Sequence, residues 1–299
     1  MDSREHSWLT QITRTVGAAL TRIETAHSLD KVAGPVSSVV DRFVPVGTLR
    51  DLLHGVPFGH PAHPMLVQVP LGAWLSAVVL DRMRGQHRAS TLLVGVGTAA
   101  AVPAAAAGIV DWAKTHQSQQ RVGLVHWAAN TVAVGFFAAS FVQRVRGHQA
   151  SGRRLALLGM TAASAGGFLG GHLAYRQAVG ANHNERIPYV LPDEWESMGA
   201  LDDVPERELV RRHVGDVPVL LYRTGANVRV LADECTHLAG PLSDGELCGD
   251  RDDLPCVRCP WHGSEFSLVD GAVIHGPATS PQHLFRTRVR DGQVEVNAH

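Results

Sequence analysis

The most regular feature of the chain is a series of long segments without Asp, Glu, Lys or Arg. Four such segments follow one another, namely the residues between Asp51 and Asp81, then 89–110, 122–143 and 155–175. The last three are each close to the ~20 residues that a membrane-spanning helix requires. Four buried helices of a soluble core are the alternative. Four uncharged segments separated by short charged loops favour transmembrane helices instead.

The first segment is longer than a single span. Pro57, Pro61 and Pro64 predict a loop in its early part, so its helix is expected to begin near Pro64. All four segments are rich in Ala, Gly, Val and Leu, and small residues allow membrane helices to approach closely. We therefore predict a four-helix transmembrane domain over residues 51–176.

Residues 1–50 show a different pattern. Trp8, Ile12, Val16, Ala19 and Ile23 recur at the spacing of a helix, whereas the charged residues lie mostly off that stripe. This predicts an amphipathic N-terminal helix that lies on the bilayer or on the other helices.

Composition adds to this organisation. The chain has 299 residues, enough for two domains, and its 18% of charged residues is below the usual quarter. The formal net charge of −1 gives no electrostatic case for a nucleic-acid partner. We expect a linker at 177–186 and a second domain over 187–299, so that the fold class is α + β in separate domains, with the membrane as a partner.

The second domain contains two loops that each pair a cysteine with a histidine. Cys235 and His237 form a C-x-H motif, Cys259 and His262 form a C-x-x-H motif, and 21 residues separate His237 from Cys259. A 2Fe–2S cluster with two cysteines on one iron and two histidines on the other needs this division of ligands. A structural zinc site is the alternative, but zinc fingers usually place two cysteines in one knuckle and two histidines in another.

The residues around these ligands resemble the Rieske family. The resemblance covers about residues 187–299 and includes Gly240-Pro241-Leu242 after the first loop, Cys259-Pro260-Trp261-His262-Gly263-Ser264 as the second, and Gly276-Pro277 with an Asp291-Gly292 hairpin turn downstream. It implies an all-β Rieske domain whose four ligands hold a 2Fe–2S cluster. It also implies one-electron transfer through the exposed edges of the two histidines.

The chain departs from the quinol-oxidising members of that family. They usually carry a further cysteine in each loop, whereas here Gly240 or Pro241 follows the first loop and Trp261 precedes His262. Ser264 can still donate to a cluster sulfur, but Phe266 stands where a tyrosine hydroxyl often does. Fewer donors stabilise the reduced cluster less. We expect a potential in the lower half of the Rieske range of about −150 to +300 mV.

The two remaining cysteines are Cys248 and Cys256, which bracket a turn-like stretch between two short strands. They are poor candidates for cluster ligands because the four ligand positions are filled. A disulfide is one interpretation, suited to an oxidising compartment, and a pair of ordinary thiols is the other.

The stretch Gly59-His60-Pro61-Ala62-His63-Pro64 resembles a family of uncharacterised four-helix bacterial membrane proteins. That resemblance implies a topology but no activity. An up-down-up-down arrangement places four histidines at one membrane face: His60, His63, His126 and His172. Polar residues inside spans are costly and usually functional. These side chains could ligate haem b or another metal, or bind a quinol, with His126 and His172 facing each other. Imidazoles that only hydrogen-bond to carbonyls or water are the alternative.

The loops between the predicted helices predict sidedness. The first and third loops hold seven basic residues, against two in the second: Arg82, Arg84, Arg88, Arg144, Arg146, Arg153 and Arg154, against Lys114 and Arg121. The positive-inside rule places the first and third loops in the cytoplasm and both termini outside. Arg153-Arg154 before a moderately hydrophobic helix resembles an internal twin-arginine export signal. The alternative is that Arg153 and Arg154 are ordinary basic residues of a positively charged loop.

These features together predict a membrane-anchored one-electron carrier. We expect it in a bacterial cell membrane as a multi-pass protein, with the Rieske domain extracytoplasmic and with a redox partner protein or quinone. A relay to a haem or quinone site in the membrane would give the fusion a purpose. A redox-sensing or assembly protein, whose helices are only an anchor, is the alternative. A Rieske oxygenase is not expected, because its mononuclear iron needs a large second domain. No separate catalytic site is identified.

Overall fold

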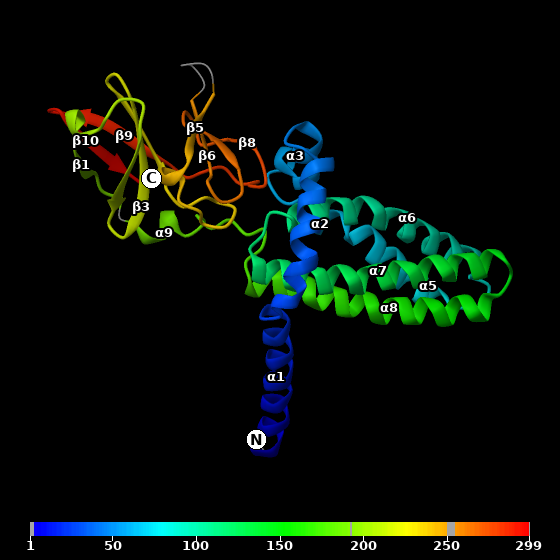
Figure 1. The fold of residues 1–299 in the computed structure, drawn as a ribbon. Helices are drawn as coiled ribbons and strands as arrows, with labels where there is room; N and C mark the ends of the chain where they lie inside the picture. Colours follow the sequence, from blue (N-terminus) through cyan, green and yellow to red (C-terminus); the bar gives the residue numbers. More distant parts are fainter. Residues whose placement is uncertain (1–2, 192, 250–254, 299) are drawn as a thin grey trace. The chain divides into compact units, whose positions relative to one another are not determined.

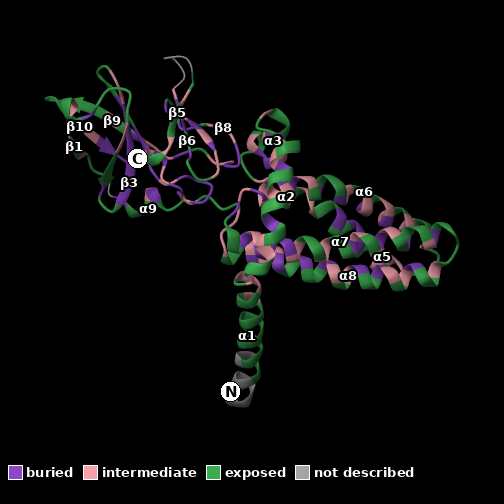
Figure 2. Cartoon of the chain, in the orientation of Figure 1, coloured by how far each residue is buried: buried purple, intermediate pink, exposed green. Residues whose placement is uncertain are grey.

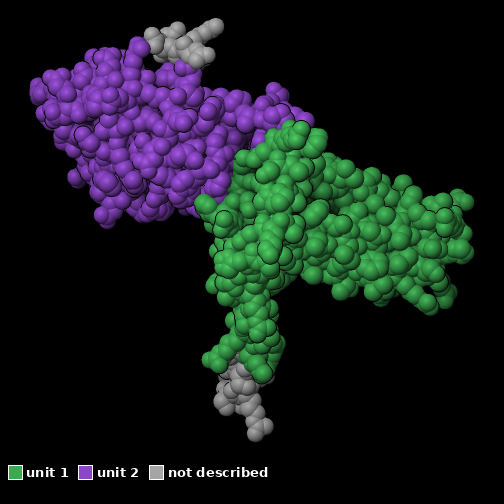
Figure 3. All heavy atoms as spheres, viewed as in Figure 1, with its two compact units in different colours: residues 1–43, 63–178 green, residues 44–62, 179–299 purple. Residues whose placement is uncertain are grey.

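The computed structural model describes residues 3–191, 193–249 and 255–298. The chain divides into two compact units, each built from two segments (Figures 1 and 3). The first unit contains Met1–Phe43 and His63–Ala178, and the second contains Val44–Ala62 and Val179–His299. The grouping differs from the domains predicted over 51–176 and 187–299, since residues 51–62 join the C-terminal unit. The reason is a set of long-range contacts that local sequence patterns do not report.

The first unit is helical. Its helices are α1 (Ser3–Glu24), α2 (Asp30–Phe43), α4 (Ala62–Leu66), α5 (Gln68–Leu80), α6 (His87–Trp112), α7 (Gln117–Val145) and α8 (Gln149–Gly171), with a 3₁₀ turn at His27–Leu29 and a π-helical turn at His172–Arg176. Three described segments are long and apolar enough to cross a membrane: Ala62–Leu80, His87–Trp112 and Gln117–Val145. They overlap three of the four predicted segments. The fourth, 155–175, falls on α8 and is not among them, because its glycines, serine and threonine dilute its leucines.

Helices α5 to α8 pack on one another through small and aromatic residues. Helix α7 lies against α6 and α8, and α5 lies against α6 and α8. The Trp74 ring of α5 stacks on Phe137 of α7 with the centroids 4.2 Å apart. A Cβ atom at Gly97 would lie 2.6 Å from Nε1 of Trp74, so only glycine fits there. Small residues thus set the close approach of these helices.

Much of the helical surface is apolar and faces away from the protein. Only 22–33% of each candidate span is buried inside the unit, and exposed residues (green) run along these helices in Figure 2. Soluble proteins rarely expose continuous apolar surface, so this surface suits lipid. Helix α1 is also exposed (Figure 2), and the predicted stripe residues Trp8, Ile12 and Val16 are among its exposed side chains.

The second unit is mainly β. Its strands are β1 (Glu196–Ala200), β2 (Leu209–Val214), β3 (Val217–Thr224), β4 (Asn227–Ala232), β5 (Glu246–Cys248), β6 (Cys256–Arg258), β7 (Glu265–Ser267), β8 (Val273–His275), β9 (Leu284–Arg290) and β10 (Gln293–Asn297). They form a six-stranded sheet, in the order β1-β10-β9-β4-β3-β2, and a four-stranded sheet, β5-β6-β7-β8. Short helices α3 (Thr48–His54) and α9 (Ile187–Val190) and 3₁₀ turns at Val56–Phe58, Leu201–Asp203 and Leu242–Asp244 complete the unit.

Strand β3 shows why this sequence makes two layers. Its residues from Val217 to Tyr222 are all buried, which matches their nearly continuous apolar run. Val219 and Leu221 face one core cluster with Val230 and Phe285, whereas Leu220 faces a second cluster. That second cluster joins the large sheet to the small one. The all-β C-terminal domain expected from the sequence is therefore confirmed.

Candidate metal centre

The first ligand loop follows β4 and closes on itself through the backbone. The amide of Cys235 donates to the carbonyl of Gly240 at 2.8 Å, and the amide of Ala239 donates to the carbonyl of Cys235 at 2.8 Å. Ala239 has a φ of 58°, an αL conformation that is uncommon for a residue with a side chain. The loop thus returns tightly on itself and holds Cys235 in the interior, where it is 1% exposed.

The second ligand loop joins β6 to β7 in the small sheet. The amide of Cys259 donates to the carbonyl of Ser264 at 2.8 Å, and the amide of Gly263 donates to the carbonyl of Cys259 at 3.1 Å. Gly263 has a φ of 78°, which glycine adopts without strain. Both loops are therefore hairpin-like turns with the cysteine at the base.

The fold brings the four predicted cluster ligands together in two pairs. The thiols of Cys235 and Cys259 share a hydrogen bond, and the rings of His237 and His262 lie 5.1 Å apart between centroids at 84°. The cysteines are 1% and 3% exposed, whereas His237 is 9% exposed and His262 is half-buried. Sulfur donors thus lie in the interior and imidazoles nearer the surface.

Ionisation of the thiols also suits metal binding. The hydrogen bond to Cys259, together with burial, raises the pKa of Cys235 well above its ordinary value. The same hydrogen bond lowers the pKa of Cys259 to about 7. One thiol of the pair therefore loses its proton near neutral pH, and the thiolate is the form that binds metal.

Close packing shapes the space beside the sulfurs. A Cβ atom at Gly240 would lie 3.0 Å from Sγ of Cys259 and 3.0 Å from ring atoms of Trp261. The Trp261 side chain itself is 50% exposed. Two inner sulfurs, two outer imidazoles and a closely packed backbone at Gly240 fit a 2Fe–2S cluster ligated by two cysteines and two histidines.

A third loop, residues 276–282 between β8 and β9, supports both ligand loops. The amide of Ala278 donates to Oγ of Ser264 at 2.9 Å, and the hydroxyl of Thr236 donates to the carbonyl of Ser280 at 2.8 Å. Oε1 of Gln282 accepts from the amide of Thr236 at 3.1 Å. Sequence reasoning missed Thr236 and Gln282, because Thr and Gln are common residues with no motif of their own.

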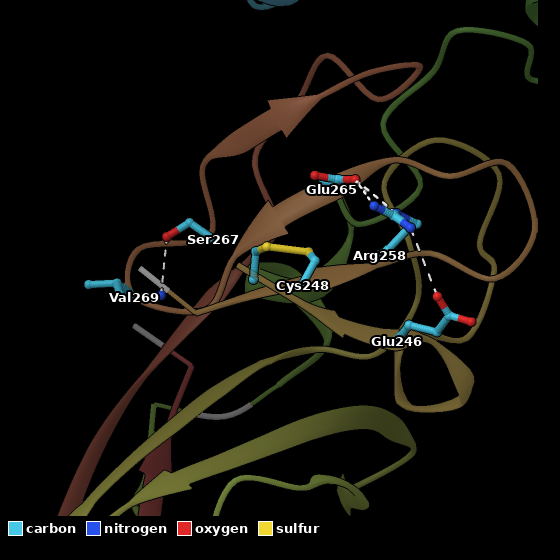
Figure 4. The surroundings of a disulfide bond; sticks show 7 residues. Glu246, Cys248, Arg258, Glu265, Ser267 and Val269 are labelled. Carbon is cyan, nitrogen blue, oxygen red and sulfur yellow. Dashed lines mark hydrogen bonds and ion pairs between the residues drawn. A yellow bond between two sulfur atoms is a disulfide. The ribbon is translucent and has the colours of Figure 1, made fainter. Parts of the chain in front are cut away.

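The other two cysteines lie in the small sheet, and Figure 4 shows their surroundings. Cys248 of β5 and Cys256 of β6 are paired in register, and their sulfurs are bonded at 2.20 Å. Nearby, Arg258 pairs with Glu265 at 2.7 Å and with Glu246 at 3.9 Å. Of the two interpretations left open by the sequence, the structure contains the disulfide.

The structure brings together two of the four histidines predicted for a membrane site. The rings of His63 and His126 have centroids 6.2 Å apart at 79°. Nδ1 of His63 contacts the carbonyl of Ala104 at 2.7 Å, and Nδ1 of His126 contacts that of Gly166 at 2.8 Å. Each ring therefore donates from Nδ1, which leaves Nε2 without a proton in the neutral form.

The other two histidines are placed differently. Nε2 of His172 contacts Oε1 of Glu24 at 2.8 Å, at the start of the π-helical turn. No ring contact between His126 and His172 occurs in the described part of the chain. His60 belongs to the second unit, where it is exposed. The predicted face-to-face pairing of His126 with His172 is replaced by His126 beside His63.

The surroundings of these rings do not fit a haem. A Cβ atom at Gly108 would lie 2.6 Å from Nδ1 of His63, and one at Gly170 would lie 3.1 Å from Cε1 of His126. Helices α6 and α8 thus lie directly against the imidazoles. A porphyrin between these helices would have to displace their backbones.

Comparisons with known proteins match two separate parts of the chain. Residues 194–290 match the model of the Rieske [2Fe-2S] domain, and residues 59–183 match that of a predicted membrane protein family (DUF2231). The anthranilate 1,2-dioxygenase ferredoxin subunit of Burkholderia cepacia is 35% identical over 104 residues, which cover 35% of this chain and 92% of that protein. Ferredoxin CarAc of Metapseudomonas resinovorans is 33% identical over 103 residues, which cover 34% of this chain and 92% of that protein.

Part of the chain also matches chains of solved structures. The complex of reduced oxygenase and oxidized ferredoxin in carbazole 1,9a-dioxygenase contains a chain that is 31% identical, with coverage of 36% of this chain and 96% of that one. The TM-score is 0.32, so the assignment of residues 194–290 depends on the sequence matches.

Proposed function

The chain belongs to the Rieske [2Fe-2S] family through residues 194–290, and we propose that it is an electron-transfer protein held at a membrane by its helical unit. The observation that carries this proposal is the pairing of the two ligand loops, with sulfurs inside and imidazoles outside. A bound 2Fe–2S cluster supplies reversible uptake of one electron.

Each ligand has a distinct task in this proposal. As thiolates, Cys235 and Cys259 would hold one iron of the cluster, in a site shielded from water. His237 and His262 would hold the other iron, and their rings are the least buried part of the ligand set. The imidazole edge, beside the exposed ring of Trp261, is therefore where a redox partner would approach the cluster.

The partners follow from the two parts of the chain. Relatives of the C-terminal domain are named ferredoxin subunits of dioxygenases, which supports a protein as electron donor or acceptor. The match to a predicted membrane protein family and the three apolar segments support a multi-pass location in a bacterial cell membrane. A membrane quinone is then the alternative acceptor. A haem is not part of this proposal, because helices α6 and α8 lie directly against the rings of His63 and His126.

Redox sensing or assembly is the second candidate function. The hydrogen bonds of His63 and His126 to backbone carbonyls favour a helical unit that serves only as an anchor. Repeated reduction and reoxidation distinguishes the two functions. A carrier cycles many times with a reductase and an acceptor, whereas a sensor changes state once and then binds or releases a partner.

Spectroscopy of the full chain in detergent tests the proposal. Dithionite reduction is expected to give a paramagnetic signal of low average g-value, because histidine ligation localises the electron on the outer iron. Metal analysis is expected to give two irons for each chain. One zinc and no iron in protein prepared without oxygen would contradict the proposal.

A further inference from the structure

One helix of the second unit, α3, lies in the N-terminal part of the sequence, far from the strands of that unit. Helix α3 lies within Val44–Ala62, which belongs to the same compact unit as Val179–His299 (Figure 3). The Rieske match begins at residue 194, and the membrane-family match begins at residue 59. Neither match includes α3, which spans Thr48–His54.

Both carboxylate oxygens of Asp51 on α3 contact residues at the start of the third loop. Oδ2 contacts Nδ1 of His275 at 2.8 Å, and Oδ1 accepts from the amide of Gly276 at 3.0 Å. The Asp51 side chain is 13% exposed, and that of His275 is 34% exposed. Hydrogen bonds to a charged group are stronger than neutral ones, and partial burial limits screening by solvent.

The neighbours of Asp51 on α3 fix its position. His54 is fully buried, and a Cβ atom at Gly276 would lie 3.0 Å from its Cδ2. Arg50 is 4% exposed and donates to the carbonyl of Val44 at 3.0 Å. Helix α3 therefore lies closely against the loop, with little space for a side chain at Gly276.

The third loop, which Asp51 contacts, is the loop that supports both ligand loops. Two residues after Gly276, the amide of Ala278 donates to Ser264, which itself lies two residues after His262. Further along, the carbonyl of Ser280 accepts from Thr236, which lies between Cys235 and His237. A continuous set of hydrogen bonds thus leads from Asp51 to the neighbours of the ligands.

We infer that Asp51 is a positioning residue for the cluster, which it serves by holding residues 275–282 against the two ligand loops. The inference rests on the proposed cluster. A bidentate carboxylate fixes the loop at His275 and Gly276, and the loop then fixes Ser264 and Thr236. Outer hydrogen bonds of this kind orient metal ligands and tune the metal. In this chain, these hydrogen bonds come from the segment Val44–Ala62, which in sequence falls between the two segments of the helical unit.

Substitutions in the full-length protein test this role. Asp51→Ala removes both contacts, Asp51→Asn keeps an acceptor for Gly276 but loses the charge, and His275→Ala removes one contact. Glu295→Gln is the matched control, because it breaks an ion pair with Arg288 on β9 and β10 of the large sheet. The readouts are the rate of cluster bleaching by an iron chelator and the g-values of the reduced protein.

Asp51→Ala is expected to lose its cluster about tenfold faster than the unaltered protein and to show shifted g-values. Hydrogen bonds to charged groups are worth roughly that ratio. For Asp51→Asn and His275→Ala, the bleaching rates are expected to lie between those of the unaltered protein and Asp51→Ala. These two variants test the inference if Asp51→Ala does not fold. Glu295→Gln is expected to match the unaltered protein.

Two results overturn the inference. In the first, the unaltered protein holds its cluster, and Asp51→Ala, Asp51→Asn and His275→Ala all bleach at the rate of the unaltered protein and show its g-values. In the second, Glu295→Gln accelerates bleaching as much as Asp51→Ala does, which would indicate general destabilisation. An unaltered protein without iron would instead overturn the proposed function, and this inference with it.

Discussion

The four proposed ligands are held by loops whose backbones are already fixed. Each cysteine lies at the base of a closed turn, with the amides of Cys235 and Cys259 bonded to Gly240 and Ser264. The histidines follow two or three residues later, where the loop has reached the surface. The closed turns, together with the spacing of the ligands, therefore place the cysteines inside and the histidines nearer the surface.

The first prediction concerns these ligands. His237→Ala or His262→Ala is expected to abolish the low-g signal, because either change removes a nitrogen ligand of the outer iron. Cys235→Ser or Cys259→Ser is expected to lose the iron and also to destabilise the domain, since metal binding is coupled to folding. Iron analysis, paramagnetic resonance and thermal unfolding measure these effects. His213→Ala, an exposed histidine on β2, is the control and should retain the full signal.

The second prediction concerns Ser264, which is fully buried and accepts a hydrogen bond from the amide of Ala278. Ser264→Ala leaves that amide without its partner, which is expected to cost about 1–3 kcal/mol of stability. Loss of the hydroxyl is also expected to lower the reduction potential, because the reduced cluster is stabilised by fewer donors. Thermal unfolding and a redox titration measure the two effects.

Ser267→Ala supplies the comparison for Ser264→Ala. Ser267 also accepts from a backbone amide, that of Val269, but it lies outside the ligand loops (Figure 4). An unchanged potential in Ser264→Ala would show that the hydroxyl only supports the loop.

At the scale of elements, sequence patterns predicted helices better than their ends. The uncharged segment 122–143 lies inside α7, which runs from Gln117 to Val145. The helix extends further because polar residues continue it, whereas a search for uncharged residues ends at the first charge. The predicted segment 155–175 begins and ends later than α8, which runs from Gln149 to Gly171 and is not among the three candidate spans.

The candidate site shows the same division between local and distant information. The ligand loops were predicted because residue type and spacing carry the chemistry. The role of Asp51 was not, because it depends on contacts between residues far apart in the sequence, such as that between Asp51 and His275. No local period or motif reports such a contact.

The third prediction concerns the histidines between helices. His63→Ala removes a hydrogen bond from α4 to Ala104 of α6, and His126→Ala removes one from α7 to Gly166 of α8. Each change is expected to cost about 0.6 kcal/mol, the typical value for hydrogen bonds between membrane helices. Thermal unfolding in detergent measures the loss.

The exposed His148, which lies between α7 and α8, gives the control variant His148→Ala. Haem absorbance in the unaltered protein, lost on His63→Ala or His126→Ala, would contradict a purely structural role for the pair.

At the scale of the whole molecule, ion pairs sharpen the charge asymmetry of the loops. In the second loop, Lys114 pairs with Asp41 at 3.0 Å and Arg121 pairs with Asp30 at 2.6 Å. Both basic residues of that loop thus have a carboxylate partner. Among the residues that the structure describes, the seven basic residues of the first and third loops make one such pair, Arg144 with Asp81. The uncompensated positive charge is therefore concentrated on the side predicted to be cytoplasmic.

The last prediction follows from this asymmetry and concerns sidedness. A reporter fused after His299 is expected to be active only outside the cytoplasm, because basic loops keep the opposite ends of the helices inside. Replacing Arg153 and Arg154 together by Lys keeps the charge but removes the arginine pair. If that pair is read as an export signal, the reporter is expected to become cytoplasmic. The matched change at Arg82 and Arg84 keeps the same charge outside the pair and should leave the reporter where it was. Cytoplasmic activity in the unaltered fusion would contradict the orientation. An unmoved reporter after the Arg153 and Arg154 change would leave these residues as ordinary members of a positive loop.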